Sequence, residues 1–124
     1  MPDSRLVGVE TVRVDRLDDL WPAIARDAAR PYLKMDTQGS ELDVLRGGKR
    51  VLEAMSLVEV ELSLLPVYDS APLFAEVYGL LAQQGFTPIA FEGVLDDTET
   101  GEMLQADGIF RRGTGSILAT TEIR

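Results

Sequence analysis

Residues 31–47 read PYLKMDTQGSELDVLRG, and this stretch decides the fold. It opens with a short apolar run that ends in Asp36, which is typical of a central strand. The turn that follows contains Gly39, which permits a positive φ or a close backbone approach. Ser40 can then cap a helix. A strand therefore leads into a helix here, and Asp36 projects at the carboxyl end of the strand.

The helix that begins after Ser40 carries apolar residues at helical spacing. Gly47 and Gly48 interrupt this pattern, so we expect two short helices in place of one. Asp43 lies three residues after Ser40 and completes an imperfect capping box. The buried stripe of the two helices is expected to consist of Leu42, Leu45, Leu52 and Met55.

On both sides of this stretch the apolar pattern alternates between period 2 and period 3.6, which indicates α/β layering. Helical crossovers imply parallel strands with right-handed connections, and a polar loop before the last strand implies an antiparallel last pair. We therefore expect a partial Rossmann-like α/β sheet, mostly parallel with an antiparallel last strand, and helices on both faces. The expected strands span 7–14, 31–36, 57–62, 86–91 and 107–111, the flanking helices 18–29 and 73–84, and the polar loop 93–105.

Composition and charge exclude several classes of function. The 124 residues suffice for one domain, and 12 basic against 21 acidic side chains give a net charge of −9,. Such a chain repels nucleic acid and anionic membranes. The absence of cysteine excludes disulfides and thiolate chemistry, and the absence of histidine excludes Ser-His-Asp triads and imidazole metal sites,. Residues 1–13 do not resemble a secretory signal, and no apolar run approaches the ~20 residues of a membrane span. We therefore expect a cytoplasmic protein.

Acidic residues near the ends of predicted strands are the candidates for chemistry. Asp36 and Glu41 flank the turn after a strand. They either face a crevice at the carboxyl end of the strand, or their negative charges are simply favoured by the N-terminal end of the next helix. Glu61 shares a strand face with Glu59 but lies nearer the carboxyl end, so it faces either the crevice or a solvated sheet face. Asp107 opens the last strand as a ligand or as part of a turn. Their spacing matches no recognised metal motif, so we expect no metal site.

Two further features bear on the binding of ligands. Tyr68 lies in a loop bounded by prolines, where it either covers a pocket or serves in packing,. No Gly-rich turn follows a strand near the start of the chain, so the fingerprint of a dinucleotide or phosphate site is absent. Ligands of a doubly wound sheet are instead expected beyond the carboxyl ends of its strands.

Residues 12–112 resemble the C-terminal part of an FkbM-type S-adenosylmethionine-dependent methyltransferase. The family pattern Lys-Ile-Asp-x-x-Gly-x-Glu, followed by x-x-Leu-x-Gly, falls on the stretch quoted above. A Thr-Leu-Asp-Asp element corresponds to residues 16–19, with Arg in place of Thr. A Glu-Leu-Ser then Pro-x-Tyr signature spans residues 61–68, and a closing element spans 100–110. The matched positions of the main pattern are Lys34, Asp36, Gly39, Glu41, Leu45 and Gly47.

The resemblance implies methyl transfer from S-adenosylmethionine to an oxygen nucleophile, often a hydroxyl of a sugar or natural product. It places two carboxylates beside the methyl acceptor, where either can serve as general base. The implied roles are catalytic for Asp36 and Glu61, cofactor-binding for Asp18 and Gln38, and acceptor-binding for Glu41, Tyr68 and Asp107.

The family's N-terminal half carries a glycine-containing cofactor loop and a ribose-binding acid, and this chain contains neither. The resemblance therefore implies that residues 1–112 are the C-terminal portion of a class I methyltransferase-like domain, truncated before its cofactor loop, and that 113–124 form a tail. On this basis we do not expect useful turnover by the isolated chain. The alternative is a non-catalytic remnant or a partner-binding module with the same half-fold.

The strand from Tyr32 to Asp36 is expected to lie at an edge of the sheet unless residues 7–14 pair with it. Exposed apolar edges invite pairing with another chain. We therefore expect a homodimer, or a second chain, to bind along this edge.

Overall fold

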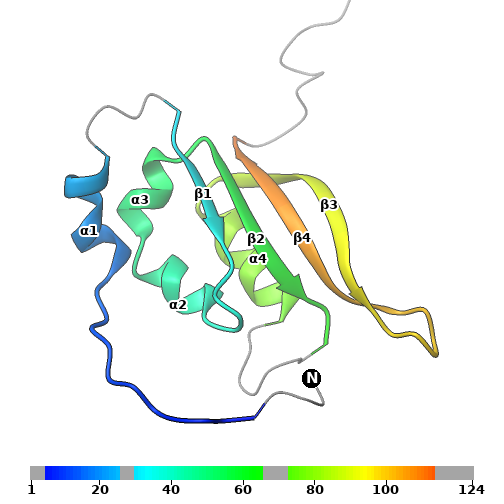
Figure 1. Ribbon diagram of the computed structural model, residues 1–124. Helices are drawn as coiled ribbons and strands as arrows, with labels where there is room; N and C mark the ends of the chain where they lie inside the picture. Colours follow the sequence, from blue (N-terminus) through cyan, green and yellow to red (C-terminus); the bar gives the residue numbers. More distant parts are fainter. Residues whose placement is uncertain (1–4, 26–29, 66–72, 114–124) are drawn as a thin grey trace, which may run out of the picture.

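A computed structural model of the chain describes residues 5–25, 30–65 and 73–113. Its elements form one sheet with helices packed against it (Figure 1). In chain order they are α1 (Leu17–Ile24), β1 (Tyr32–Met35), α2 (Glu41–Arg46), α3 (Lys49–Ala54), β2 (Leu57–Ser63), α4 (Phe74–Gln83), β3 (Phe86–Asp96) and β4 (Met103–Arg112).

The sheet has the strand order β1-β2-β4-β3 and is mostly antiparallel. Only β1 and β2 pair in parallel, whereas β4 pairs antiparallel with both β2 and β3. The prediction of a mostly parallel sheet was therefore wrong. The crossover through α4 does bring β3 back parallel to β2, but β4 lies between the two strands. Its insertion converts one expected parallel ladder into two antiparallel ladders.

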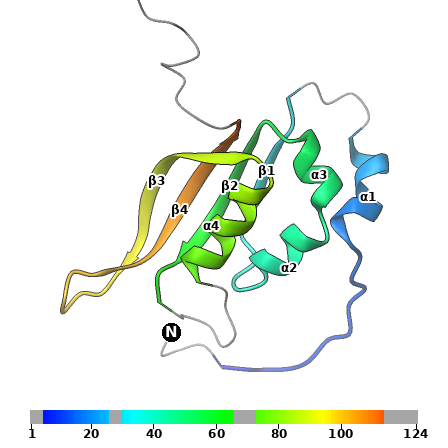
Figure 2. The ribbon, with the colours of Figure 1, turned by 180° about the vertical axis from the view of Figure 1, so that it is seen from behind.

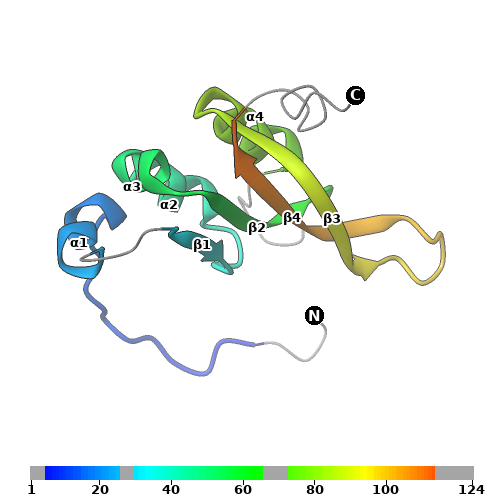
Figure 3. The same ribbon diagram turned by 90° about the horizontal axis from the view of Figure 1, so that it is seen from above.

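The helices of the described chain all lie on one face of the sheet (Figures 2 and 3). The expectation of helices on both faces was wrong for a topological reason. The crossovers from β1 to β2 and from β2 to β3 advance in the same direction across the sheet. Right-handed crossovers that advance in the same direction place their helices on the same face. The other face of the sheet, turned toward the viewer in Figure 1, carries no helix of the described chain.

The core lies between this helical layer and the sheet, and β2 provides its centre. Val58, Val60 and Leu62 are fully buried against the helices, whereas Glu59 and Glu61 alternate with them and point to the open face. This alternation is the period-2 pattern that identified the strand from the sequence. One side of β2 thus stabilises the fold, and the other side is available for chemistry.

Aromatic side chains complete the core beneath β4 and β3. Phe110 meets the rings of Tyr78 and Phe91 edge-on, with ring centroids 6.0 and 6.3 Å apart. Gly108 leaves room for this cluster, because a Cβ at that position would lie 2.7 Å from a methyl carbon of Leu62. A glycine is therefore required on the helix-facing side of β4.

Several expected boundaries are confirmed. The helix after the first turn breaks at Gly47 and Gly48 into α2 and α3, and Gly85 follows α4 with a φ of +88°. Ser40, however, makes no side-chain capping bond to α2, so the expected capping box is absent there. Residues 93–105, expected as a loop, instead continue β3 to Asp96 and begin β4 at Met103. The tail from residue 114 lies outside the described residues.

Residues 7–14 do not form the expected strand and have no regular secondary structure. They leave the start of α1 as an exposed, extended segment that runs away from β1 (Figure 1). The alternation of apolar residues predicts a strand, but a strand also needs a partner for its backbone groups. No strand of the described chain pairs with this segment.

Asp18 joins α1 to α3 by capping a helix other than its own. Its carboxylate accepts hydrogen bonds from the backbone N–H groups of Arg50 (3.2 Å) and Val51 (3.0 Å), in the first turn of α3. The residue that precedes α3 is Gly48, which has no side chain with which to cap. Asp18 therefore supplies from α1 the acceptor that an N-cap side chain would usually provide.

Replacing Asp18 with Ala should lower the free energy of unfolding by about 1–2 kcal/mol, because the N-terminal groups of α3 lose their acceptor. Urea unfolding followed by circular dichroism would measure the change. Asp19→Ala is the matched control, since Asp19 is the exposed neighbour in the same helical turn. Equal stability of the two variants would show that Asp18 does not cap α3.

No helix in the described ranges combines the length and the apolar character needed to cross a bilayer.

Candidate functional site

Three carboxylates converge on the open face near the carboxyl ends of β1 and β2. Asp36 follows β1, Glu61 lies on β2, and Asp107 lies on β4 directly opposite Glu61 in the antiparallel register. We call these three side chains the carboxylate cluster. They come from three elements that the sheet brings together, as the sequence predicted for the carboxyl end of such strands.

Burial and repulsion raise the pKa of two carboxylates of the cluster, Glu61 and Asp107. The pKa of Glu61 is raised, first by burial and then by the charges of Asp36, Asp107 and Glu41. The pKa of Asp107 is also raised, first by burial and then by Glu59. Carboxylates held near other acids in a partly dry position take up protons at higher pH than exposed ones. This is the environment that makes a carboxylate a stronger base near neutral pH.

A tyrosine and a lysine border the cluster on β1. The hydroxyl of Tyr32 donates a 2.5 Å hydrogen bond to Glu59, and the ammonium of Lys34 lies 3.9 Å from the same carboxylate. The hydrogen bond to Glu59 is the main cause that raises the pKa of Tyr32 to about 12. Glu59 is thus occupied by two partners. Lys34 also tends to lower the pKa of Asp107, opposite to the effect of the surrounding acids.

The turn after Asp36 has a backbone shape that few residues adopt. Gln38 has a φ of +51° and Gly39 a φ of +111°, and Gln38 is the one non-glycine residue with positive φ in the described ranges. Glu41 is only 5% exposed, and its carboxylate accepts a hydrogen bond from the N–H of Gly39 at 3.0 Å. Backbone strain of this kind persists where the surroundings fix it, and such positions cluster at functional sites.

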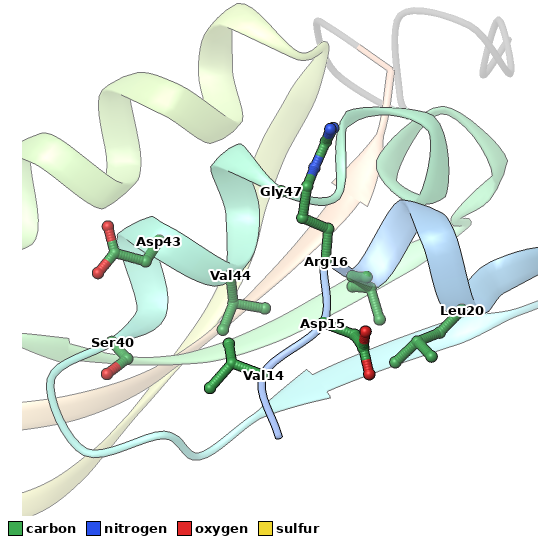
Figure 4. Close-up of a pocket in the computed structure, with 9 residues that line it drawn as sticks. Val14, Asp15, Arg16, Leu20, Ser40, Asp43, Val44 and Gly47 are labelled. Carbon is green, nitrogen blue, oxygen red and sulfur yellow. The ribbon is translucent and has the colours of Figure 1, made fainter. Parts of the chain in front are cut away.

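A hollow of about 490 Å³ opens beside this turn, between residues 14–20 and α2 (Figure 4). Its size falls within the range of small-molecule sites. Ser40, only four residues after Asp36, lies in its wall, so one turn connects the hollow to the carboxylate cluster. Four aliphatic side chains, four polar side chains and one glycine line the hollow: Val14, Leu17, Leu20 and Val44; Asp15, Arg16, Ser40 and Asp43; and Gly47.

The structure gathers most, but not all, of the residues singled out from the sequence. Glu41 acts electrostatically on the cluster, and Gln38 is exposed in the turn that leads away from it. Asp18 lies instead between α1 and α3, where its carboxylate is engaged by backbone N–H groups. Tyr68 lies outside the described residues. The assignment of roles to these residues remains a prediction.

Three polar contacts beside the cluster were not predicted from the sequence. Glu59 was set aside in favour of Glu61, yet it binds Tyr32 and Lys34. The buried amide of Gln105 donates a 3.3 Å hydrogen bond to Ser63. Period-2 alternation in β1 could have placed Tyr32 and Lys34 on the open face with Glu59. No comparable signal identifies Gln105, because its contact depends on the β2–β4 register.

No group of three or more acidic side chains in the described ranges is arranged to hold a metal ion. The carboxylates of the cluster can act as bases and as hydrogen-bond acceptors.

A family model described as "Methyltransferase FkbM domain" matches residues 3–88, which is more than half of the chain. The matched range contains α1, β1, the turn with its two positive φ angles, α2, α3, β2 and α4. No curated protein and no solved structure matches the chain.

Proposed function

The chain belongs to the FkbM methyltransferase family, and we propose from this premise that its carboxylate cluster is the acceptor site of an O-methyltransferase. One observation carries the proposal: Asp36, Glu61 and Asp107 meet at the carboxyl edge of the sheet, and the pKa of Glu61 is raised there. A hydroxyl acceptor needs a group that removes its proton as the new bond to carbon forms. A carboxylate of raised pKa meets that need.

Glu61 is the general base in this proposal. It lies between Asp36 and Asp107, so both neighbours favour its protonated form. When a hydroxyl donates a hydrogen bond to Glu61, the proton can pass to the carboxylate and relieve this repulsion. The same neighbours that destabilise the charge of Glu61 before the reaction therefore favour proton transfer during it.

The acceptor is a compound with several hydroxyl groups, such as a sugar. Asp36 and Asp107 flank the base and present carboxylate oxygens, which accept hydrogen bonds and donate none when ionised. They suit neighbouring hydroxyl donors on a single small molecule. A molecule that bears a negative charge is disfavoured, because Glu59 and Glu92 add to the acidity of the same face,.

We place the cofactor of this family in the hollow beside the turn, although this chain lacks the glycine-containing loop that the family uses. Aliphatic walls from Val14, Leu17, Leu20 and Val44 suit a flat adenine ring, and the carboxylate of Asp43 can accept hydrogen bonds from ribose hydroxyls,. When bound, S-adenosylmethionine supplies an electrophilic methyl group on its sulfonium. The protein's part is to hold the acceptor in line and to take up its proton.

Calorimetric titration with S-adenosylmethionine tests the assignment of the hollow. Leu20→Arg should weaken binding at least tenfold, because a charged side chain would enter an apolar wall,. Ile24→Arg is the matched control, since Ile24 lies one turn further along α1, is 64% exposed and does not line the hollow. The proposed site is wrong if the unmodified chain releases no heat at millimolar cofactor. It is equally wrong if Leu20→Arg and Ile24→Arg bind S-adenosylmethionine with the same affinity.

A further inference from the structure

Two polar side chains are buried on the face of the sheet that carries no helix of the described chain (Figure 1). Ser63, the last residue of β2, is 9% exposed, and Gln105 on β4 is 5% exposed. They lie opposite each other in the β2–β4 register. Because side chains on one face of a strand recur every two residues, this pair follows Glu61 and Asp107 on the same face. The carboxylate cluster thus continues into a buried polar pair.

Gln105 fixes the direction of the Ser63 hydroxyl. The amide nitrogen Nε2 of Gln105 donates a hydrogen bond of 3.3 Å to Oγ of Ser63. A serine hydroxyl has two lone pairs and one proton to donate. Since one lone pair faces Gln105, the proton points toward another acceptor. No residue in the described part of the chain accepts it.

A buried hydroxyl whose proton has no acceptor within the described chain calls for a specific explanation. Buried polar groups in folded proteins nearly always have hydrogen-bond partners, because an unpaired one costs free energy. An alanine would occupy position 63 without that cost. The place of Ser63 beside the carboxylate cluster supplies the explanation, because the missing acceptor can belong to a molecule bound there.

Ser63 complements the chemistry of the carboxylates. When ionised, Asp36, Glu61 and Asp107 only accept hydrogen bonds, so they bind the protons of a ligand's hydroxyl groups. Ser63 offers a proton, and it follows Glu61 by about 7 Å along β2. With a hydrogen bond of about 2.8 Å at each end, one small molecule can contact both side chains. Such a ligand presents hydroxyls to the carboxylates and an oxygen without a proton to Ser63.

We propose that Ser63, oriented by Gln105, donates a hydrogen bond to the ring oxygen or the glycosidic oxygen of a sugar acceptor. These are the oxygens of a glycoside that carry no proton, and the contact selects glycosides over carbocyclic polyols. The inference rests on the proposed function, because it takes Glu61 to lie beside the methylated hydroxyl. Ser63 is a binding residue in this account, and Gln105 is a positioning residue that acts through it.

A binding experiment on the unmodified chain tests the proposal without any substitution. NMR titrations would compare the methyl glycosides of glucose, galactose and mannose with two analogues of each. One analogue carries CH₂ in place of the ring oxygen, and the other carries sulfur in place of the glycosidic oxygen. At least one glycoside should bind about tenfold more tightly than one of its analogues, because that analogue leaves the buried proton of Ser63 unpaired.

Replacing Ser63 with Ala should abolish this preference. The glycoside and its analogues should then bind with equal affinity, about tenfold more weakly than the unmodified chain binds the glycoside. Ser56→Ala is the matched control, since Ser56 is exposed just before the other end of β2, and it should keep the preference. A merely structural role of Ser63 would weaken the binding of all three compounds together and leave their ratio unchanged.

Replacing Gln105 with Glu tests the positioning role. A carboxylate only accepts hydrogen bonds, so it should take the Ser63 proton for itself. The preference for the glycoside should disappear although the hydroxyl is still present. Gln83→Glu controls for the added charge, because Gln83 is exposed at the end of α4, and it should keep the preference. A preference that survives in Gln105→Glu would show that Gln105 does not orient Ser63.

Three results would overturn the assignment of Ser63. The unmodified chain would bind no glycoside, it would bind every glycoside and its analogues equally, or the preference would survive in Ser63→Ala. A water molecule that takes up the proton of Ser63 would give the second result. All three are binding measurements, so they are separable from methyl transfer. A chain that keeps the preference but transfers no methyl group would contradict only the proposed reaction.

Discussion

Replacing Glu61 with Gln should slow methyl transfer about 10²–10⁴-fold, the range expected when a general base is lost. The amide keeps the size of the side chain but cannot take up the acceptor's proton. Asp36 and Asp107 remain in place to bind the acceptor, so its binding should change far less than the rate. Single-turnover rates at saturating acceptor, together with acceptor titrations, separate the two effects.

The same substitution should stabilise the chain at neutral pH. The folded protein raises the pKa of Glu61 above its ordinary value of 4.5, so the folded state disfavours the ionised form. At low pH the carboxyl is protonated in both the folded and the unfolded chain, and no penalty arises. As pH rises through the raised pKa, the penalty develops in full and stability falls. Glu61→Gln removes this penalty, so its advantage should grow with pH and then level off.

Urea unfolding between pH 4 and pH 8 measures this difference. Glu53→Gln is the matched control, because Glu53 is exposed on α3, and its free energy of unfolding should stay within about 0.5 kcal/mol of the unmodified chain,. A loss of both activity and stability in Glu61→Gln would show that Glu61 holds the fold together. A slower reaction in a more stable protein is the signature of a residue kept for its chemistry.

Replacing Arg112 with Ala should lower the free energy of unfolding by about 3 kcal/mol, because several charged hydrogen bonds are lost together. Its guanidinium donates to the carbonyls of Met55 (3.0 Å) and Leu52 at the end of α3, and to that of Gln84 (3.3 Å) after α4. It also lies 4.6 Å from the ring centroid of Phe86,. One side chain at the end of β4 thus binds the carbonyl ends of two helices, where a positive charge is favoured.

The variant Arg112→Lys separates the contribution of the positive charge to stability from the contribution of the guanidinium's shape. Lysine keeps the positive charge but lacks the planar fork that reaches both helices, so it should recover only part of the loss. Arg50→Ala controls for removing an exposed arginine from α3 and should cost no more than about 0.5 kcal/mol,. If Arg112→Ala unfolds at the same urea concentration as Arg50→Ala, the bonds to the helix ends contribute nothing measurable.

The segment from β1 to β2 could be predicted from the sequence because local signals agree there. An apolar run, a glycine turn, a broken helical stripe and a period-2 strand each point to the observed element. The sheet beyond β2 could not be predicted in the same way. The position of β4 between β2 and β3 depends on pairing between residues far apart in the sequence. The polar residues 93–105, which lie in the middle of the β3–β4 hairpin, show neither the period-2 pattern of a strand nor the period-3.6 pattern of a helix,. The prediction of a strand at residues 7–14 was wrong for a related reason. Alternation of apolar residues identifies a potential strand but does not identify the strand with which it pairs.

In the candidate site, too, the features that follow from local patterns could be predicted, and those that depend on long-range pairing could not. Asp36 and Glu61 could be placed together because the carboxyl ends of neighbouring parallel strands meet at one edge. The position of Asp107 opposite Glu61 follows from the β2–β4 register, which no local pattern encodes. The capping of α3 by Asp18 joins residues more than thirty positions apart, and the sequence suggested only a charge favoured by its own helix,.

The most direct test of the account is whether the chain moves a labelled methyl group from S-adenosylmethionine to a hydroxyl oxygen. Single-turnover conditions, with excess chain and a panel of neutral sugars, allow slow transfer to be detected, and mass spectrometry locates the label. We expect a methyl ether on a sugar hydroxyl, formed slowly by the unmodified chain because it lacks the family's cofactor loop, and formed at least 100-fold more slowly still by Glu61→Gln. Transfer at equal rates by both proteins, or no methyl ether on any acceptor, would contradict the account.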